Sequence, residues 1–259
     1  MNNEAFTQLL YQKGEEQYRT MPWREDIRPY YVLVSELMLQ QTQVARVIPK
    51  FEAFIDAFAS EKELAVASLA DVLIHWQGLG YNRRAKFLHE AAKEIVRRGT
   101  FPDTHEDLLK LPGVGKNTAG AILAYSFNQP SIFIETNIRT VYIHHFFNDQ
   151  FDINDKQITE LLKQTIDHEH PREFYWALMD YGSWLKANGV RNISSSKHYK
   201  KQSPLAGSLR EMRGMIIRNL SNNTEVEQLK ADARFEQALK DLEREGMINS
   251  DSGIIKLTK

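Results

Sequence analysis

The sequence predicts an all-α main body followed by a small winged-helix-like module at the C-terminus. Apolar residues recur at helical spacing in one segment after another, and no strand pattern of useful length occurs before residue 245. Residues 246–257 alternate around an Asp-Ser-Gly turn, as the two strands of a hairpin do. We therefore expect a main domain over residues 1–200 and a second module over residues 201–259.

Each expected helix follows from a stripe of apolar residues that ends at a turn signal or a change of period. In the main domain these helices cover residues 4–20, 29–43, 44–58, 63–76 (one or two short helices), 83–98, 106–111, the segment through 119–127, a segment from residue 138, and two helices within 155–186. In the C-terminal module they cover residues 207–220, 225–230 and 234–245.

Composition narrows the class of protein. The 259 residues have a net charge of −1, and 42% of them are hydrophobic, which is enough for a packed core. There is no apolar run of membrane-spanning length and no signal-peptide pattern, so we expect a cytoplasmic protein without membrane contact. Cysteine is absent, which excludes disulfides, thiolate nucleophiles and cysteine-ligated metals. Two close histidine pairs, at 144–145 and 168–170, lack a third ligand at suitable spacing, so we expect no metal site.

One stretch, residues 111–141, stands out for its chemistry. It opens Leu-Pro-Gly-Val-Gly-Lys-Asn-Thr, and a helical pattern follows at once, so N–H groups of the first helical turn face the loop. Such a helix start attracts phosphate, and Lys116 adds positive charge. An ordinary helix–turn–helix with a glycine turn would show the same loop. The later part of the stretch argues against that plainer interpretation, because an apolar run delivers a single carboxylate, Glu135, to the start of the next helix.

Five ordered motifs, spread over roughly residues 18–187, carry a family resemblance. They are Met21-Pro22-Trp23-Arg24, the segment from Ser35 to Val44 (Ser-Glu-Leu-Met-Leu-Gln-Gln-Thr-Gln-Val), Trp76-Gln77-Gly78-Leu79-Gly80-Tyr81, the glycine hairpin, and Ala177-Leu178-Met179-Asp180-Tyr181-Gly182. Together they resemble the helix-hairpin-helix (HhH-GPD) DNA glycosylases, in particular adenine DNA glycosylases of the MutY type. The resemblance implies one lobe formed by the N-terminal helix and residues 131–200 and another formed by about 24–130.

The resemblance also implies roles for two carboxylates. Glu36 falls on the general-acid position and would protonate adenine N7; its apolar helix should raise its pKa, although an exposed glutamate on an amphipathic helix is the plainer alternative. Glu135 would stabilise the developing oxocarbenium ion, and the helix dipole should favour its ionised form. Asn137 matches the family's asparagine and is expected to cap the helix, to hydrogen-bond the site, or both. Arg139 is interpreted as a phosphate contact or a solvated surface residue.

Three departures from the family pattern are visible. Glu135 stands where the family has aspartate. Asn117 stands where bifunctional relatives such as endonuclease III have a Schiff-base lysine, and since an amide cannot form that bond, a monofunctional enzyme is expected. Most relatives have four cysteines for an iron–sulfur cluster after the Met-Asp-x-Gly motif, and this chain has none, so we expect no cluster.

The resemblance assigns DNA contacts to residues around the flipped nucleotide and along the hairpin. They are Gln40, Gln41, Tyr81, Leu111, Gly113, Val114, Gly115, Lys116, Asn117 and Thr118. Backbone carbonyls near Leu111, Val114 and Gly115 could also hold an alkali or alkaline-earth ion. In the C-terminal module, Lys200, Lys201, Arg210 and Arg213 are expected to strengthen DNA binding through their charge.

We therefore expect a monomeric, nucleoid-associated DNA glycosylase of base excision repair that binds double-stranded DNA with a mispair or lesion. Its expected substrate is adenine opposite 8-oxoguanine or guanine. Two alternatives stay open: a mismatch thymine or uracil glycosylase, and a catalytically inactive DNA-binding protein on the same scaffold.

Overall fold

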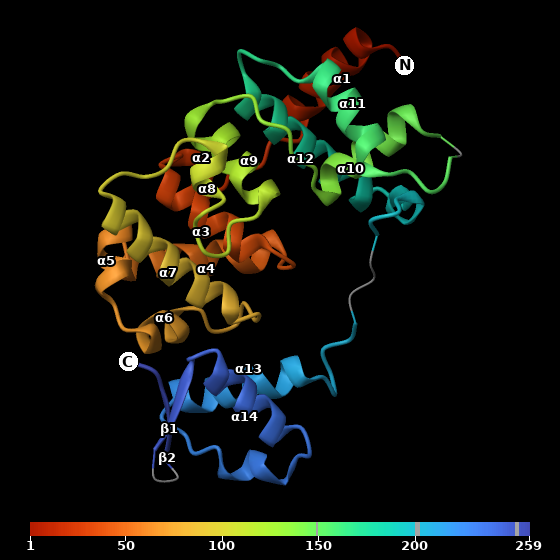
Figure 1. Ribbon diagram of the computed structural model, residues 1–259. Helices are drawn as coiled ribbons and strands as arrows, with labels where there is room; N and C mark the ends of the chain where they lie inside the picture. The colour runs from red at the N-terminus through yellow and green to blue at the C-terminus, as the bar shows by residue number, and fades with distance from the viewer. Residues whose placement is uncertain (149, 200–202, 252–253) are drawn as a thin grey trace. The chain divides into compact units, whose positions relative to one another are not determined.

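The computed structural model describes residues 1–148, 150–199, 203–251 and 254–259, and these residues are mostly helical (Figure 1). The expected all-α main body is confirmed. The α-helices are α1 Asn3–Glu16, α2 Pro22–Glu25, α3 Pro29–Leu39, α4 Val44–Ala57, α5 Glu61–Val66, α6 Leu69–His75, α7 Arg83–Arg98, α8 His105–Leu108, α9 Lys116–Phe127, α10 Thr136–Phe146, α11 Asp155–Thr165, α12 Pro171–Ala187, α13 Leu209–Ser221 and α14 Phe235–Arg244. Two 3₁₀ helices, η1 Asn192–Ser195 and η2 Glu227–Ala231, and two strands, β1 Ile248–Asp251 and β2 Ile254–Leu257, complete the described chain.

The helix starts follow from local hydrogen bonds that the sequence encodes. Ser60 and Ser68 accept the N–H of the residue three positions on, at the starts of α5 and α6. Asn154 and Gln157 form a reciprocal capping box at the start of α11. Because such caps satisfy backbone donors that the helix itself leaves open, these boundaries agree with the sequence pattern.

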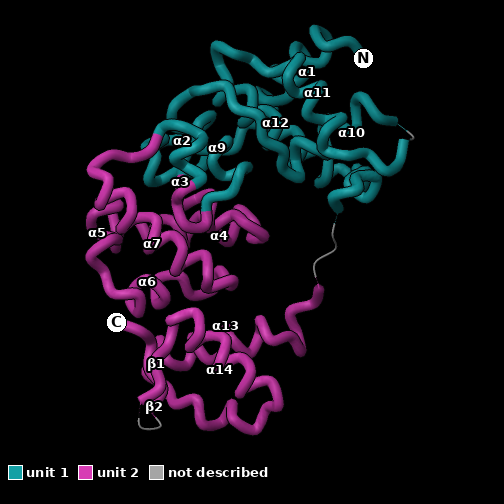
Figure 2. Tube along the Cα trace, in the orientation of Figure 1, with its two compact units in different colours: residues 1–32, 103–109, 114–201 teal, residues 33–102, 110–113, 202–259 magenta. Residues whose placement is uncertain are grey.

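The chain divides into two compact units, drawn in teal and magenta in Figure 2. Unit 1 consists of residues 1–32, 103–109 and 114–201, and unit 2 of residues 33–102, 110–113 and 202–259. The domain and lobe boundaries expected from the sequence stay predictions.

Unit 1 is built around α12, which packs against both α1 and α10. Its core is aromatic: Phe6 of α1 lies against Tyr142 and Phe146 of α10, and Phe133 stacks on Tyr175 with ring centroids 4.1 Å apart. Gly182 lets α12 approach α10 closely, because a Cβ there would lie 2.5 Å from the carbonyl oxygen of Asn137. The glycine of the Met-Asp-x-Gly motif is thus explained by packing.

Unit 2 joins residues 33–102 to the C-terminal segment. Helix α7 packs against α5 and α6, and α13 packs against both α6 and α14. Trp76 is fully buried and donates its indole N–H to the carbonyl oxygen of Gly80. Gln77 donates to the Ser221 hydroxyl at 3.0 Å, which links the end of α6 to the end of α13.

The C-terminal hairpin is confirmed by antiparallel pairing of β1 with β2, from Ile248 opposite Leu257 to Asp251 opposite Ile254. The turn expected at residues 252–253 lies outside the described residues. The helix expected over 225–230 is wrong in type: residues 227–231 form a 3₁₀ turn, with the N–H of Leu229 bonded to the carbonyl of Val226. So short a segment favours the tighter bonding pattern.

Two helices end earlier than the periodicity predicts. The first ends at Glu16 rather than near residue 20, and the N–H of Arg19 donates to the Asp180 carboxylate instead of to a helical carbonyl. Helix α3 ends at Leu39 rather than at Gln43, since Gln41 adopts a left-handed backbone with φ of +58°. Among the described residues, none of the helices has the length and apolar character of a membrane span.

Candidate active site

The glycine hairpin has the backbone that its sequence predicts. Gly113 has φ of +77°, in the left-handed region, and a Cβ there would lie only 2.7 Å from the Cβ of Phe87. Gly115 is the N-cap of α9 and provides no capping side chain, so it leaves N–H groups of the first turn for an outside acceptor.

The side chains of the hairpin differ in their exposure to solvent. Lys116 is exposed, whereas Leu111, Val114 and Thr118 are buried. Any DNA contact at these three positions would therefore come from the backbone. The assignment of the hairpin to DNA binding stays a prediction, and so does an ion held by its carbonyls.

Asn117 is bonded to the backbone that leads into the candidate catalytic carboxylate. Its Nδ2 donates to the carbonyl oxygen of Ile134 at 2.8 Å, and its Oδ1 accepts from the N–H of the same residue at 3.4 Å. The amide therefore pairs with Ile134 much as a neighbouring strand would. Because Glu135 follows directly, Asn117 fixes the backbone from which the Glu135 side chain projects.

Glu135 is the N-cap of α10, and its half-buried side chain makes no capping hydrogen bond within the described residues. Burial raises the pKa of this carboxyl group, and the positive charge of Arg139 opposes the rise only in part. The expected ionised form of Glu135 therefore stays a prediction, because burial acts against the negative charge.

Arg139 forms an ion pair with Asp155. Its Nε and Nη2 donate to the two carboxylate oxygens of Asp155, each at 2.7 Å. A bidentate pair of this kind fixes the guanidinium plane. The solvated-surface alternative for Arg139 is thus wrong, since its side chain is only 17% exposed, and a phosphate contact stays a prediction.

Asn137 lies inside the first turn of α10 and does not cap it, so the capping alternative is wrong. Its Nδ2 lies 4.0 Å from the Met179 sulfur. Its Oδ1 is buried and has no hydrogen-bond partner in the described part of the chain. An unsatisfied buried acceptor is costly, which makes this atom a candidate for binding a substrate donor or a water molecule.

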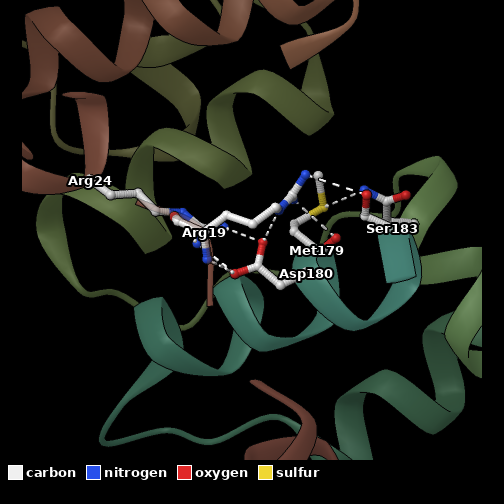
Figure 3. A network of polar contacts seen from close by, with 6 residues as sticks. Arg19, Arg24, Met179, Asp180 and Ser183 are labelled. Atoms are coloured by element: carbon white, nitrogen blue, oxygen red, sulfur yellow. Dashed lines mark hydrogen bonds and ion pairs between the residues drawn. The ribbon is translucent and has the colours of Figure 1, made fainter. Parts of the chain in front are cut away.

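A buried ion-pair network joins α12 to α2 and to the segment between α1 and α2. Asp180, 1% exposed, accepts from Arg19 Nε at 2.6 Å and from both terminal nitrogens of Arg24 at 2.6 and 3.0 Å (Figure 3). The Arg24 guanidinium also lies 5.2 Å from the ring centroid of Trp176. Both residues belong to motifs that are visible in the sequence, but the bond between Arg24 of one motif and Asp180 of the other shows only in the structure.

Glu36 lies on α3 among fully buried neighbours. Ser35, Leu37 and Met38 are each 0% exposed, while Glu36 itself is half-buried. The apolar setting expected for a general acid is therefore present along this helix segment. Its assignment as the acid stays a prediction.

Arg84 is the functional candidate that sequence reasoning missed. It is 6% exposed, and its Nη1 donates to the carbonyl oxygens of Leu37, Met38 and Gln40 at 2.7–2.9 Å. Its Nη2 donates to the carbonyls of the 79–80 loop, both at 3.0 Å. Burial lowers the pKa of this guanidinium to about 10, so it stays charged at neutral pH. The sequence does contain a sign of this role, because Arg84 falls on the stripe of residues 84, 88, 91 and 95, which is otherwise apolar.

Arg84 thereby joins two loops that carry candidate DNA-distorting residues. Gln41 follows the end of α3 and Tyr81 follows Gly80, and both have left-handed backbones, with φ of +58° and +47°. Left-handed conformations of such residues persist only where the surroundings enforce them. The carbonyl bonds of Arg84 supply that constraint.

The candidate residues fall into both units. Those of unit 2 are Glu36, Gln40, Gln41 and Tyr81, and those of unit 1 are Asn117, Glu135 and Asn137. That both sets act in one active site stays a prediction from the family resemblance.

The iron–sulfur cluster of the family does not fit this chain, because four cysteine ligands are required and none is present. The segment after α12 is bonded instead by Asn192, whose Nδ2 donates to the carbonyl oxygen of Thr140 at 3.0 Å. Ile153 also pairs with the 195–197 backbone. In the residues that the structure describes, no three His, Asp or Glu side chains are grouped to hold a metal ion.

Comparison with known proteins identifies a family. The HhH-GPD superfamily of base excision DNA repair proteins matches residues 34–168, a segment that contains both Glu36 and Glu135. An adenine DNA glycosylase of Buchnera aphidicola subsp. Baizongia pistaciae is 40% identical over 187 residues, which cover 69% of this chain and 52% of that protein. Those of Mycobacterium tuberculosis H37Rv and Homo sapiens are 38% and 36% identical, over 64% and 69% of this chain and 57% and 35% of their own lengths.

The chain thus spans about half the length of the curated relatives it matches. Among solved structures, a thermostable thymine-DNA glycosylase superposes with a TM-score of 0.62 at 22% identity, covering 70% of this chain and 86% of that one. A likeness at this identity shows the fold.

The first prediction concerns Arg84. Replacing it in Arg84→Met leaves carbonyls at the end of α3 and in the 79–80 loop without donors, which should lower the free energy of unfolding by roughly 2–4 kcal/mol. Urea unfolding measures the change. The neighbouring Arg83→Met is the control, since Arg83 is 61% exposed and should change stability by less than about 0.5 kcal/mol. Equal stabilities of the two variants would contradict the role assigned to Arg84.

The second prediction compares two glycines. Gly182→Ala should destabilise unit 1 by about 1–3 kcal/mol, because the added Cβ meets the Asn137 backbone. Gly214→Ala, inside α13 with open space around the new Cβ, should stabilise the protein by about 0.5–1 kcal/mol. Thermal or urea unfolding that shows the same sign for both variants would contradict this account of the helix packing.

Proposed function

Because the chain belongs to the HhH-GPD superfamily of base excision DNA repair proteins, we propose that it is a monofunctional DNA glycosylase that removes adenine mispaired with 8-oxoguanine or guanine. The base preference is supported by the adenine glycosylases that share 36–40% identity with it. Its partner is double-stranded DNA that contains the mispair, and it acts as a monomer.

The monofunctional reaction is supported by one observation, the pairing of Asn117 with Ile134 beside Glu135. The position at which bifunctional relatives place a nucleophilic lysine holds an amide whose donor and acceptor are both bonded to backbone. The residue next to that backbone is a carboxylate at a helix start with no capping bond in the described chain. This arrangement supplies negative charge near a sugar and no amine nucleophile.

In the proposed reaction Glu36 donates a proton to adenine N7 as the C1′–N9 bond breaks, and the bond's electron pair leaves with the base. Ionised Glu135 stabilises the positive charge that develops on the deoxyribose. Water then adds to C1′, and its proton is released to solvent, so the products are adenine and an abasic site. The Asn137 Oδ1, which lacks a partner among the described residues, accepts a hydrogen bond from the water or the substrate.

Single-turnover assays test the proposed function directly. Duplexes with A:8-oxoG, A:G, T:G and U:G pairs are incubated with excess protein and then treated with alkali. We expect alkali-dependent strand breaks at adenine only. Release of thymine or uracil alone would establish the mismatch glycosylase instead, and no release from any duplex would establish an inactive DNA-binding protein. Strand cleavage without alkali would contradict the monofunctional mechanism.

The third prediction concerns the charge of Glu135. Since burial raises its pKa above the ordinary value of 4.5 and the ionised form is required, activity should fall with decreasing pH already above pH 4.5. Glu135→Gln should lower the single-turnover rate about 10²–10³-fold because the charge is lost. Glu135→Asp keeps the charge and should retain measurable activity. A Glu135→Gln rate equal to wild type would place the stabilising charge elsewhere.

A further inference from the structure

Two arginine side chains contact Tyr81. The guanidinium carbon of Arg84 lies 5.4 Å from the centroid of the Tyr81 ring, and that of Arg210 lies 4.9 Å from it. The Arg210 Nη1 also donates a hydrogen bond to the Tyr81 hydroxyl. Arg84 belongs to α7, next to the tyrosine in sequence, whereas Arg210 comes from α13, 129 residues away.

Arg210 differs from the other cations of this surface. Arg213, one turn along α13, forms a bidentate ion pair with Glu245, and Arg83 lies 3.8 Å from the same carboxylate. Within the described residues Arg210 has no carboxylate partner; besides Tyr81 it bonds the carbonyl oxygen of Ser203 at 3.1 Å. The charge of Arg213 is thus already paired, its contribution to DNA binding stays a prediction, and the expected contacts Lys200 and Lys201 lie outside the described residues.

Helix α13 holds Arg210 in place, because several bonds join it to the rest of unit 2. Gln77 bonds Ser221 at the far end of α13, and Lys86 of α7 donates to the carbonyl oxygen of Glu245. The Arg213–Glu245 pair connects α13 to the end of α14. The arginine is therefore presented to Tyr81 by a packed helix and not by a loose tail.

We propose that Arg210 is a positioning residue for Tyr81, so that the C-terminal segment takes part in distorting DNA and is not only an additional DNA-binding module. The inference rests on the proposed function, which requires Tyr81 to enter the base stack. The guanidinium holds the phenol at its hydroxyl and across its ring face before DNA arrives, and restricting a side chain in its working orientation lowers the entropy cost of using it.

The contact is tested first in the free protein. A single 3-fluorotyrosine placed at residue 81 reports the environment of the ring through its ¹⁹F resonance. Arg210→Ala should shift this resonance. The control Arg218→Ala removes the same charge from an exposed position of the same helix and should leave it in place. Circular dichroism shows whether both variants keep the fold. An unshifted resonance in folded Arg210→Ala overturns the proposal.

The functional role is tested by a double-mutant cycle with 2-aminopurine in place of the target adenine. Stopped-flow fluorescence at saturating protein follows base extrusion. Arg210→Ala should slow the rise in 2-aminopurine fluorescence about tenfold, and Arg218→Ala should leave its rate unchanged. In the Tyr81→Ala background Arg210→Ala should add no further slowing, because the residue that it positions is gone. Equal slowing in both backgrounds means that Arg210 acts without Tyr81 and overturns the proposal.

Failure of the proposed function has a separate signature. If wild-type protein gives no fluorescence rise and releases no base from any duplex, the glycosylase assignment falls, and the role of Arg210 in DNA distortion falls with it. If base release is normal but the ¹⁹F resonance and the double-mutant cycle show no coupling, only the positioning role is overturned.

Discussion

A buried guanidinium that is neutralised by no carboxylate within the described residues sets the geometry of unit 2. Arg84 lies under the end of α3, where a helix leaves its last carbonyls without partners, and donates to three of them. Its other nitrogen bonds the loop before Tyr81. Burying a charge is costly unless it is hydrogen-bonded, and both terminal nitrogens of Arg84 are bonded, so the two loops can hardly move without breaking several charge-assisted bonds. The left-handed backbones of Gln41 and Tyr81 depend on this one side chain.

Unit 1 also depends on a buried charged side chain, but here the charge is negative. Asp180 is buried between two arginines, and Gly182, two residues on, allows α12 to touch the backbone of α10 near Asn137. The Asn117 amide bonds the backbone just before Glu135. Glu135, Gln41 and Tyr81 therefore stand at helix ends or in loops, next to polar side chains that bond the surrounding backbone. Rigid support of this kind is what a site needs if its side chains are to meet a substrate without rearrangement.

Much of the fold could be predicted from the sequence because helical periodicity is a local property. The helices from α4 to α9 and the final hairpin follow from spacing, caps and glycines. The errors in helix length have tertiary causes, because Arg84 and Asp180 bond backbone groups at the points where α3 and α1 end earlier than the periodicity predicts. The solvated position expected for Arg139 was wrong because Arg139 forms an ion pair with Asp155, sixteen residues away in the sequence. Motif resemblance named the candidate carboxylates, but the residues that hold them in place show only in three dimensions.

We propose that Glu36 donates the proton that lets adenine depart. The most direct measurement is the single-turnover rate of adenine release from an A:8-oxoG duplex by Glu36→Gln, with duplex affinity measured alongside. The amide keeps the shape but has no acidic proton, so the rate should fall by about 10²–10⁴-fold while affinity stays near wild type. Glu52→Gln, at an exposed position of α4, is the matched control and should leave the rate unchanged. A Glu36→Gln variant that releases adenine as fast as this control would contradict the account.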